Sequence, residues 1–210
     1  AGLRVPHLAD RPMHGDEANQ AVKAGILLET GRYAYDPKDH HGPTLYYFTL
    51  PVAWVLGQHT LADMTEYTCR IVPLVFGVGV VLSAVLLWNA LGWGTVLIAM
   101  FLLAVSPAMT FYSRYYVQEM LLVFFTATAL GCGWRYVQAV RDVQDPPTAK
   151  PVAATASLCW AIAVGASLGL MHATKETSVL AFAAMAGAGG LAVCWGKVRV
   201  ITEAQRKHNG

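Results

Sequence analysis

The sequence predicts an all-α fold, a polytopic bundle of transmembrane helices. Apolar residues make up 55% of the 210 residues and charged residues only 13%, compared with about 25% charge in soluble domains. The mean hydropathy is +0.43, and the apolar residues come in long runs with few charges between them. Runs of about 20 apolar residues are what a helix needs to cross a bilayer. The net charge of +2 is too small to indicate a nucleic-acid partner.

Residues 1–43 are polar and contain one short amphipathic pattern. Its apolar positions follow the i, i+3, i+4, i+7, i+8 spacing of one helix face and are Ala18, Ala21, Val22, Gly25 and Ile26. Asp16 is a residue type that caps a helix start, and Gly31 is a type that ends a helix. We therefore expect a helix between them that lies along the membrane surface.

Residues 43–57 are apolar and aromatic but too short to span a membrane. A helix over this stretch is about 22 Å long, whereas the hydrocarbon core is about 30 Å thick. Pro51 also interrupts it. We interpret the segment as a juxtamembrane or re-entrant helix, so that residues 1–66 form a first loop on one face of the membrane.

Residues 67–196 form the expected transmembrane module, with five candidate spans. These spans are about 69–91, 95–112, 117–139, 152–172 and 176–195. The second is the shortest, and we expect Pro107 to kink it because proline leaves a backbone carbonyl without its donor. Residues 197–210 form a basic tail. The chain starts at Ala1, and we expect it to be part of a longer protein whose first transmembrane helix precedes it.

The four cysteines, Cys69, Cys132, Cys159 and Cys194, lie within or at the edge of apolar segments. None has CxxC or Cys/His spacing, so we interpret them as small packing residues and not as a disulfide or zinc site.

The order of the spans divides the loops between two faces. If residues 43–57 do not span, the first loop shares one face with the links at 113–116 and 172–177. The other face receives the links at 89–94 and 141–151 and the tail. This second face holds a group of basic residues: Arg135 near a helix end, Arg141, Lys150, Lys197, Arg199, Arg206 and Lys207. The positive-inside rule makes that face cytoplasmic and the first face extracytoplasmic.

Acidic residues gather on the first face. Asp16 and Glu17 form a pair that either caps a helix or supplies a general base or metal ligand. Glu119 lies just inside an apolar run, where a carboxylate is costly unless it is paired. It is either half of an ion pair with Arg114 across the turn or a second acidic group in a reaction centre.

Basic residues on the same face are candidates for contact with a phosphate. Lys38 and His41 belong to a Gly-Pro turn that is either a solvated loop or a donor cluster. Lys175, beside Glu176, is either an interfacial lysine with a snorkelling side chain or a cation that holds an anionic lipid headgroup.

The order of these motifs resembles the GT-C glycosyltransferase superfamily, in particular the protein O-mannosyltransferases and aminoarabinose transferases. It is most similar to the flippase-associated PMT-like membrane proteins of archaea and bacteria. The motifs that carry the resemblance are Asp16-Glu17, Gly31-Arg32-Tyr33, His41-Gly42-Pro43, the Arg114–Glu119 segment and Lys175-Glu176. The resemblance covers about residues 1–195, as the N-terminal portion of a larger protein.

The resemblance implies a GT-C-like helical fold and transfer of a sugar from a polyprenyl-phosphate donor to a lipid, glycan or protein acceptor. The reaction is expected at the extracytoplasmic face of the plasma membrane. By the resemblance Asp16 is the catalytic base or a metal-associated group, Glu17 its partner, and Glu119 the acidic residue of the second outer loop.

The resemblance also leaves parts of the site open. Relatives often have Lys-Pro where this chain has His41-Gly42-Pro43, so the phosphate contact falls to Lys38, His41, Arg114 or Lys175. A divalent metal is left open as a cofactor, with His14, Asp16 and Glu119 as candidate ligands. The C-terminal region completes the lipid and acceptor pockets in relatives, so we expect the chain to be inactive alone.

Two rival hypotheses belong to other classes. A transporter or lipid flippase component predicts ionisable residues at mid-membrane depth and broken helices there. The spans contain few ionisable residues, which favours an enzyme. The other rival is a non-catalytic scaffold, against which the intact Asp16 and Glu119 argue.

Overall fold

The computed structural model describes residues 2–33, 35, 42–144 and 151–208. These residues form helices joined by turns and include no β-strand, so the predicted all-α fold is confirmed. The chain divides into two compact units, Ala1–Glu176 and Thr177–Gly210. In the described part of the second unit there is one helix, α9 (Ser178–His208).

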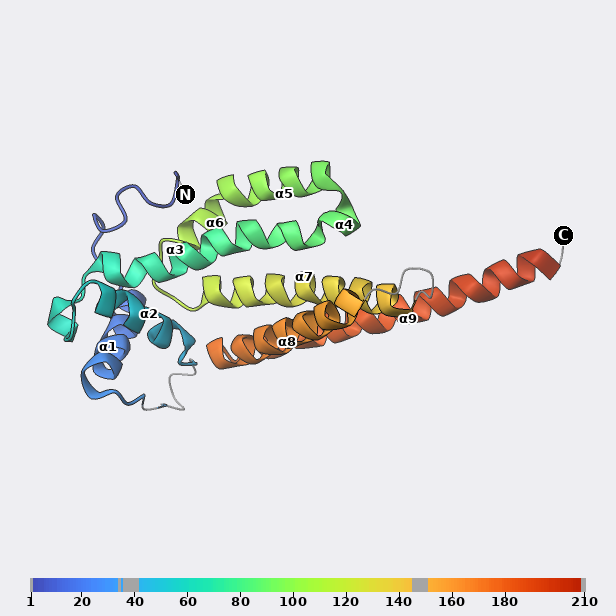
Figure 1. The fold of residues 1–210 in the computed structure, drawn as a ribbon. Helices are drawn as coiled ribbons and strands as arrows, with labels where there is room; N and C mark the ends of the chain where they lie inside the picture. Colours follow the sequence, from blue (N-terminus) through green and yellow to red (C-terminus); the bar gives the residue numbers. More distant parts are fainter. Residues whose placement is uncertain (1, 34, 36–41, 145–150, 209–210) are drawn as a thin grey trace. The chain divides into compact units, whose positions relative to one another are not determined.

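Figure 1 shows the helices of the first unit. They are α1 (Gly15–Thr30), α2 (Thr44–Val55), α3 (Glu66–Ser83), α4 (Trp88–Leu91), α5 (Trp93–Val105), α6 (Pro107–Tyr112), α7 (Glu119–Gln144) and α8 (Pro151–Thr174). The short 3-10 turns Leu61–Asp63 and Ala84–Leu87 precede α3 and α4. Helix α7 packs along both α3 and α8, α5 folds back against α3, and α2 packs against α1, α3 and α8.

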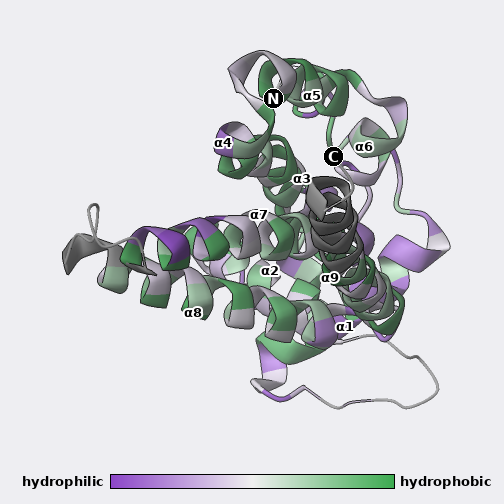
Figure 2. Ribbon diagram, turned by 90° about the vertical axis from the view of Figure 1, so that its right-hand side faces the viewer, coloured by the Kyte–Doolittle hydropathy of each residue, from purple (hydrophilic) through white to green (hydrophobic). Residues whose placement is uncertain are grey.

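Four helical segments are long and apolar enough to cross a membrane. They are Glu66–Leu91, Glu119–Val143, Ala154–Thr174 and Ser178–Trp195, and they match four of the five predicted spans. Large apolar side chains stay exposed on them, such as Leu130 on α7 and Ile162 on α8, which suits a surface that lipid covers. Figure 2 shows the same segments as mostly hydrophobic. The chain is a multi-pass membrane protein.

The remaining predicted span, 95–112, is not one continuous helix. It is divided between α5, with 13 residues, and α6, with 6 residues, and Ser106 between them has an extended ψ of 124°. Helix α5 alone is about 20 Å long, less than the hydrocarbon core. The expected disturbance at Pro107 is confirmed, but it breaks the helix instead of kinking it. Pro107 is the first residue of α6, where its missing N–H has no helical partner to lose.

Arg4 satisfies the carbonyls that this break leaves unpaired. Its Nη2 donates to the carbonyl of Leu103 at 3.0 Å, the group that an N–H at position 107 would otherwise meet. Its Nη1 donates to Ala104 O at 3.2 Å, and its Nε to Ser113 Oγ at 3.0 Å. The side chain is buried, and this burial lowers the pKa of Arg4. These hydrogen bonds hold the N-terminal segment against the junction between α5 and α6.

Helix α1 begins two residues earlier than predicted, with a different cap. His14 is the N-cap, and its ring nitrogen accepts from the backbone N–H of Asp16, so the prediction of Asp16 as the cap was wrong. Glu17 completes the capping box by accepting from His14 N at 3.1 Å. The predicted end is confirmed, because Gly31 closes the helix with a φ of 65°.

The buried face of α1 is offset from the predicted apolar stripe. Of the five residues of that stripe, Ala21 and Gly25 are buried within the protein, whereas Val22 and Ile26 are exposed. Glu17 and Gln20 are buried in their place. The periodicity of the apolar residues missed this because it counts only apolar side chains.

The start of α2 docks on the end of α8. Gly42 N donates to Thr174 O at 3.2 Å, and the hydroxyl of Thr44 donates to that of Thr174 at 2.8 Å. A Cβ at position 42 would lie 2.0 Å from the carbonyl oxygen of Ala173, so only glycine permits this approach. Helix α2 has 12 residues and is not among the candidate spans, in agreement with the prediction for residues 43–57.

Within the first unit the loops gather at two opposite ends, as predicted. The start of α1, the turn at 113–118 and the end of α8 lie at one end, and α4 lies with the end of α7 and the start of α8 at the other (Figure 1). A hydrogen bond of 3.4 Å from Asn89 to Gln138 links elements at the second end. We call the end with α1 and α2 the α1 end, and the other the α4 end.

The α1 end is organised around a buried ion pair between Glu17 and Arg70. Both side chains are almost fully buried, and Nε and Nη2 of Arg70 donate to the two carboxylate oxygens of Glu17, each at 2.9 Å. The remaining N–H groups of Arg70 donate to backbone carbonyls of the N-terminal segment, at Leu8, Arg11 and Pro12. Glu17 also accepts from Arg11 Nη2 at 3.0 Å and from Tyr116 N at 3.0 Å. One carboxylate thus joins α1, α3, the N-terminal segment and the α6–α7 turn.

The folded structure favours the ionised form of Glu17. Burial raises the pKa of this carboxyl, but the hydrogen bonds from Arg70 and from the backbone of Tyr116 and His14, together with the charge of Arg70, outweigh burial. The pKa of Glu17 is therefore held below its ordinary value.

A second buried network fixes the same turn from the side of α2. Gln118 donates to Gln20 at 3.0 Å and to the hydroxyl of Tyr46 at 3.3 Å, and Tyr46 itself donates to Gln20. The hydroxyls of Thr49 and Tyr116 lie 2.7 Å apart. Because every one of these side chains is buried, the turn that precedes Glu119 has little freedom to move.

We predict that Glu17→Gln destabilises the protein by about 3–5 kcal/mol, since the variant leaves the Arg70 charge buried without a counter-ion. Folding lowers the pKa of Glu17, so the pair contributes fully above the unfolded-state pKa of about 4.3. This contribution is lost as the pH falls from there toward the folded-state value. Thermal unfolding in detergent between pH 3 and pH 7 measures both effects.

The matched control is Asp16→Asn, because the neighbouring carboxylate is exposed and should change the stability by less than about 0.5 kcal/mol. A Glu17→Gln variant that unfolds at the same temperature as the parent protein would contradict the structural role of this ion pair.

Candidate active site

Glu119 and Lys175 form an ion pair at the α1 end. Lys175 Nζ lies 2.6 Å from Glu119 Oε1. Glu119 is the first residue of α7, and Lys175 directly follows the last residue of α8. An acid at a helix start and a base at a helix end are each favoured by the helix dipole. The predicted partner of Glu119 was Arg114, and that prediction was wrong because α8 brings Lys175 closer.

The second carboxylate oxygen of Glu119 does not take part in the ion pair. Oε2 is buried and has no hydrogen-bond partner among the described residues. A buried acceptor without a donor costs free energy that a ligand hydroxyl or amide would recover. Glu119 therefore offers one oxygen for positioning a ligand while Lys175 holds the other.

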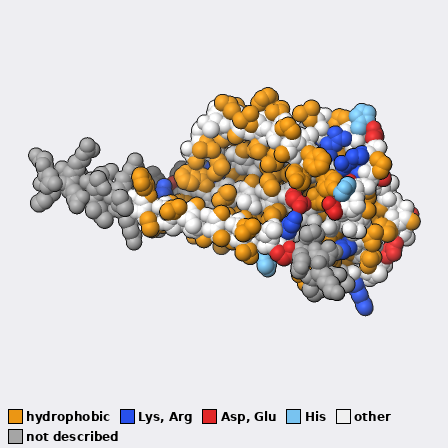
Figure 3. All heavy atoms as spheres, turned by 180° about the vertical axis from the view of Figure 1, so that it is seen from behind, with side chains coloured by type: hydrophobic (Ala, Val, Ile, Leu, Met, Phe, Trp, Pro, Cys, Tyr) orange, Lys and Arg blue, Asp and Glu red, His pale blue; other side chains and the backbone are white. Residues whose placement is uncertain are grey.

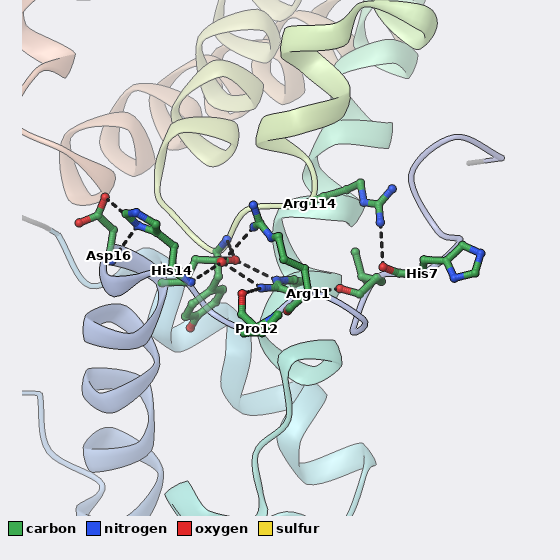
Figure 4. A network of polar contacts seen from close by, with 10 residues as sticks. His7, Arg11, Pro12, His14, Asp16 and Arg114 are labelled. Atoms are coloured by element: carbon green, nitrogen blue, oxygen red, sulfur yellow. Dashed lines mark hydrogen bonds and ion pairs between the residues drawn. The ribbon is translucent and has the colours of Figure 1, made fainter.

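Asp16 is the exposed carboxylate of this end. Its side chain is 71% exposed, and Oδ2 lies 3.7 Å from His14 Nδ1, as Figure 4 shows. That contact is long, so the carboxylate keeps its capacity to accept a proton or hydrogen bonds. The capping geometry of α1 fixes the backbone beneath it.

Tyr115 connects the start of α1 with the turn before Glu119. Its ring centroid is 6.0 Å from that of His14, and the Arg11 guanidinium is 5.2 Å from it. Burial raises the pKa of the Tyr115 hydroxyl, and the negative charges of Asp16, Glu17 and Glu119 add to this, while Arg11 opposes it. The start of α1 and the turn before α7 therefore lie close together.

A groove of about 450 Å³ lies beside this turn. Apolar residues such as Phe111 form one part of its lining, and the polar part comes from His7, Arg11, Arg70, Thr110 and Arg114. Nη2 of Arg114 donates to the backbone carbonyl of His7 at 2.8 Å, as Figure 4 shows. The groove combines cations with an apolar wall, the combination that suits a lipid phosphate.

The structure brings four of the predicted site residues to one end of the first unit: Asp16, Glu119, Arg114 and Lys175. Figure 3 shows acidic, basic and histidine side chains gathered toward this end, while apolar side chains cover more of the helices away from it. Glu17 lies beneath them, with both oxygens engaged by Arg70 and its neighbours. Lys38 and His41 are outside the described residues.

The metal candidates do not converge in the part of the chain that the structure describes. No three His, Cys, Asp or Glu side chains there form a group that could hold a metal ion. His14 and Asp16 form a pair, while Glu119 is engaged with Lys175. These described residues alone do not fit a metal ion.

Several residues that shape the site were not predicted, above all Arg70, Arg11 and Tyr115. Arg70 had a usable signal, since it lies inside the apolar run that becomes α3, where a charge must find a partner. The partner could not be named from the sequence, because Glu17 is 53 positions away. Arg11 and Tyr115 carried no comparable signal.

The cysteines and the span charges add little chemistry. All four cysteines are free; Cys69 and Cys132 are buried as expected, whereas Cys159 and Cys194 are exposed. The span Ala154–Thr174 contains no Asp, Glu, Lys or Arg. Arg70 is near the start of its span and is paired. The transporter hypothesis expected ionisable groups at mid-depth; among these candidate spans, Glu119–Val143 carries one well inside it, Arg135, eight residues before its end.

Comparison with known proteins identifies a family. The family model for dolichyl-phosphate-mannose-protein mannosyltransferases matches residues 45–206, more than half of the chain. This match includes Arg114, Glu119 and Lys175 and begins after the loop that carries Asp16. No curated protein and no solved structure matches the chain. With its multi-pass helical fold, the chain belongs to the dolichyl-phosphate-mannose-protein mannosyltransferase family of membrane glycosyltransferases.

Proposed function

We propose that this protein transfers a sugar from a polyprenyl-phosphate donor to an acceptor hydroxyl, with the reaction at the α1 end. The observation that carries the proposal is the exposed carboxylate of Asp16, mounted at a helix start at the same end of the first unit as the Glu119–Lys175 pair. Both adjoin the turn at 113–118, because His14, the cap of α1, contacts Tyr115 and Glu119 directly follows the turn. The acceptor is a lipid, a glycan or a protein.

Asp16 acts as the general base. The acceptor oxygen attacks the anomeric carbon of the donor sugar, and the bond from that carbon to the phosphate oxygen breaks. The acceptor proton passes to the carboxylate of Asp16, and the polyprenyl phosphate leaves with the electron pair of the broken bond. An exposed carboxylate suits this role, because an acceptor can reach it without displacing a partner. Direct attack opposite the phosphate inverts the anomeric configuration.

Lys175 stabilises the leaving phosphate. Its ammonium carries three N–H donors and has one partner among the described residues, Glu119, so donors remain for a phosphate oxygen. It lies where α8 leaves the apolar span, the depth at which a lipid phosphate is found. Arg114 in the neighbouring groove is a further cation at the same end.

Glu119 positions a substrate and holds Lys175 in place. Its Oε1 orients the ammonium, and its buried Oε2 accepts a hydrogen bond from a hydroxyl of the sugar or the acceptor. Glu17 stays ionised because Arg70 and backbone N–H groups donate to it, and it holds the turn before Glu119 against α1 and α3. This division assigns the proton transfer to Asp16 alone.

We assign the α1 end to the extracytoplasmic face. The assignment rests on the resemblance to the GT-C glycosyltransferases, which implies a reaction at that face.

We predict that Asp16→Asn in the complete membrane protein lowers the transfer rate by at least about 10²-fold, the scale of a lost general base. The unfolding temperature should stay unchanged because the side chain is exposed. Transfer of radiolabelled sugar from a polyprenyl-phosphate donor measures the rate. The control is Asp10→Asn, an exposed aspartate of the same segment whose Oδ2 contacts His7 at 2.6 Å. Equal activity of both variants would remove Asp16 from the mechanism.

We predict that Lys175→Met lowers kcat/KM for the lipid donor by about 10²-fold or more, since a charge-stabilising donor is lost. Arg114→Met, which removes an equal charge from the same end, should have a smaller effect. Steady-state kinetics with varied donor concentration measures both variants. A larger loss of kcat/KM in Arg114→Met than in Lys175→Met would mean that the donor phosphate binds in the groove beside Arg114.

We predict that single cysteines placed at Asp16, Glu119 and Lys175 are all labelled by an impermeant thiol reagent from outside intact cells. The parent is a variant of the complete protein from which the native cysteines have been removed. Labelling of position 16 without labelling of position 119 would place the two carboxylates in different compartments and dismantle the site.

A further inference from the structure

A second cavity lies at the α4 end of the first unit, away from the candidate active site. Its volume is about 450 Å³, and α7 and α8 line it together with the segment that contains α4. The polar side chains in its wall are those of Asn89, Arg135, Gln138, Arg141 and Asp142, with the ring of Trp160 beside them. Figure 2 shows hydrophilic positions on the corresponding part of α7, in contrast to the hydrophobic helix before it. Nothing in the proposed transfer reaction uses this cavity.

Arg135 is the group in this cavity whose bonding is incomplete. Its guanidinium lies 5.5 Å from the centroid of the Trp160 ring. Its Nη1 is buried and has no hydrogen-bond partner among the described residues. A buried guanidinium N–H without an acceptor costs free energy. A bound oxygen-rich anion would supply the acceptor, and the planar fork of arginine suits a phosphate.

The balance of charge in the cavity favours an anion over a cation. Arg135 and Arg141 supply two positive charges and Asp142 one negative charge, and both Arg141 and Asp142 are exposed. Asn89 and Gln138 add neutral hydrogen-bonding groups, which contact each other at 3.4 Å. The half-buried cation, Arg135, is therefore the feature with which a ligand must pair.

The depth of the cavity indicates where the anion comes from. Arg135 precedes Val143, the end of its candidate span, by eight residues, or about 12 Å of helix. The 25-residue span is about 37 Å long and the hydrocarbon core about 30 Å thick, so Arg135 lies about 8 Å inside the core boundary, and its long side chain can bring the guanidinium close to the headgroups. Phospholipids surround a spanning helix at far higher local concentration than any soluble phosphate.

We propose that this cavity binds the phosphate headgroup of an anionic membrane phospholipid, with Arg135 as its main contact and Arg141 at the mouth. The lipid occupies the membrane face opposite the candidate active site. The proposal rests on the cavity, the unpaired guanidinium and the span boundary, and it does not depend on the proposed transfer reaction.

The test is native mass spectrometry of the purified full chain in detergent, with equimolar phosphatidylglycerol and phosphatidylcholine of identical acyl chains. We expect the chain to retain phosphatidylglycerol about fivefold over phosphatidylcholine, the scale of one basic residue near an anionic headgroup. Arg135→Gln should lose this preference. Arg32→Gln, which removes an equal charge from an exposed residue at the other end, should keep it. Arg135→Lys should retain part of it and covers the case in which the glutamine variant does not fold.

Further arms separate the possible sources of the anion. If 10 mM inorganic phosphate displaces phosphatidylglycerol from the parent chain, the cavity reads free phosphate and the lipid proposal is overturned. Retention of phosphatidylethanolamine equal to that of phosphatidylglycerol would overturn the preference for an anionic headgroup. Loss of the preference in Arg32→Gln, or no preference in the parent chain, would also overturn the proposal.

Discussion

The buried pair of Glu17 and Arg70 is the constraint on which the α1 end depends. An arginine inside the first turns of a membrane span is tolerated only if every donor finds an acceptor. Arg70 meets this demand with one carboxylate and three backbone carbonyls of the N-terminal segment. The same carboxylate accepts from the backbone of the turn that leads into α7. The contacts that pair the buried charge of Arg70 therefore also hold the first loop against the spans and position the residues proposed for catalysis.

The sequence predicted the architecture better than the contacts, for physical reasons. Span length and apolarity are local properties, so four of the five spans and the grouping of loops within the first unit followed from counting. The break at Ser106 depends on backbone dihedrals and on Arg4, which lies a hundred positions away in the chain. The partner of Glu119 was missed because Arg114 is near in sequence, whereas Lys175 is near only after α7 and α8 pack. The sequence indicated Asp16 and Glu17 as an acidic pair, but it could not assign them different roles, because the roles differ only through the burial of Glu17 and the exposure of Asp16.

Charged side chains are paired differently at the two ends of the first unit. At the α1 end, Glu119 and Lys175 complement the start of α7 and the end of α8 and also pair with each other. At the α4 end, Arg135 is only partly complemented, by an aromatic ring and an aspartate at the cavity mouth. An ion pair that is complete without a ligand, such as Glu119 with Lys175, can release a charged product. An unpaired guanidinium N–H, such as that of Arg135, favours an anion that stays bound. The difference suits the proposed turnover at one face and the proposed lipid binding at the other.

The adjacent carboxylates Asp16 and Glu17 show how helix geometry alone divides two roles. Successive residues of an α-helix point about 100° apart, since one turn holds 3.6 residues. Once Arg70 draws Glu17 into the protein, Asp16 must point toward solvent, where it is 71% exposed. Glu17 cannot act as a base, because its five donors stabilise the ionised form and block access to both oxygens. Asp16 has neither restriction, and its backbone is fixed by the helix cap. The buried neighbour therefore supplies the rigidity and the exposed one remains available for the proton transfer.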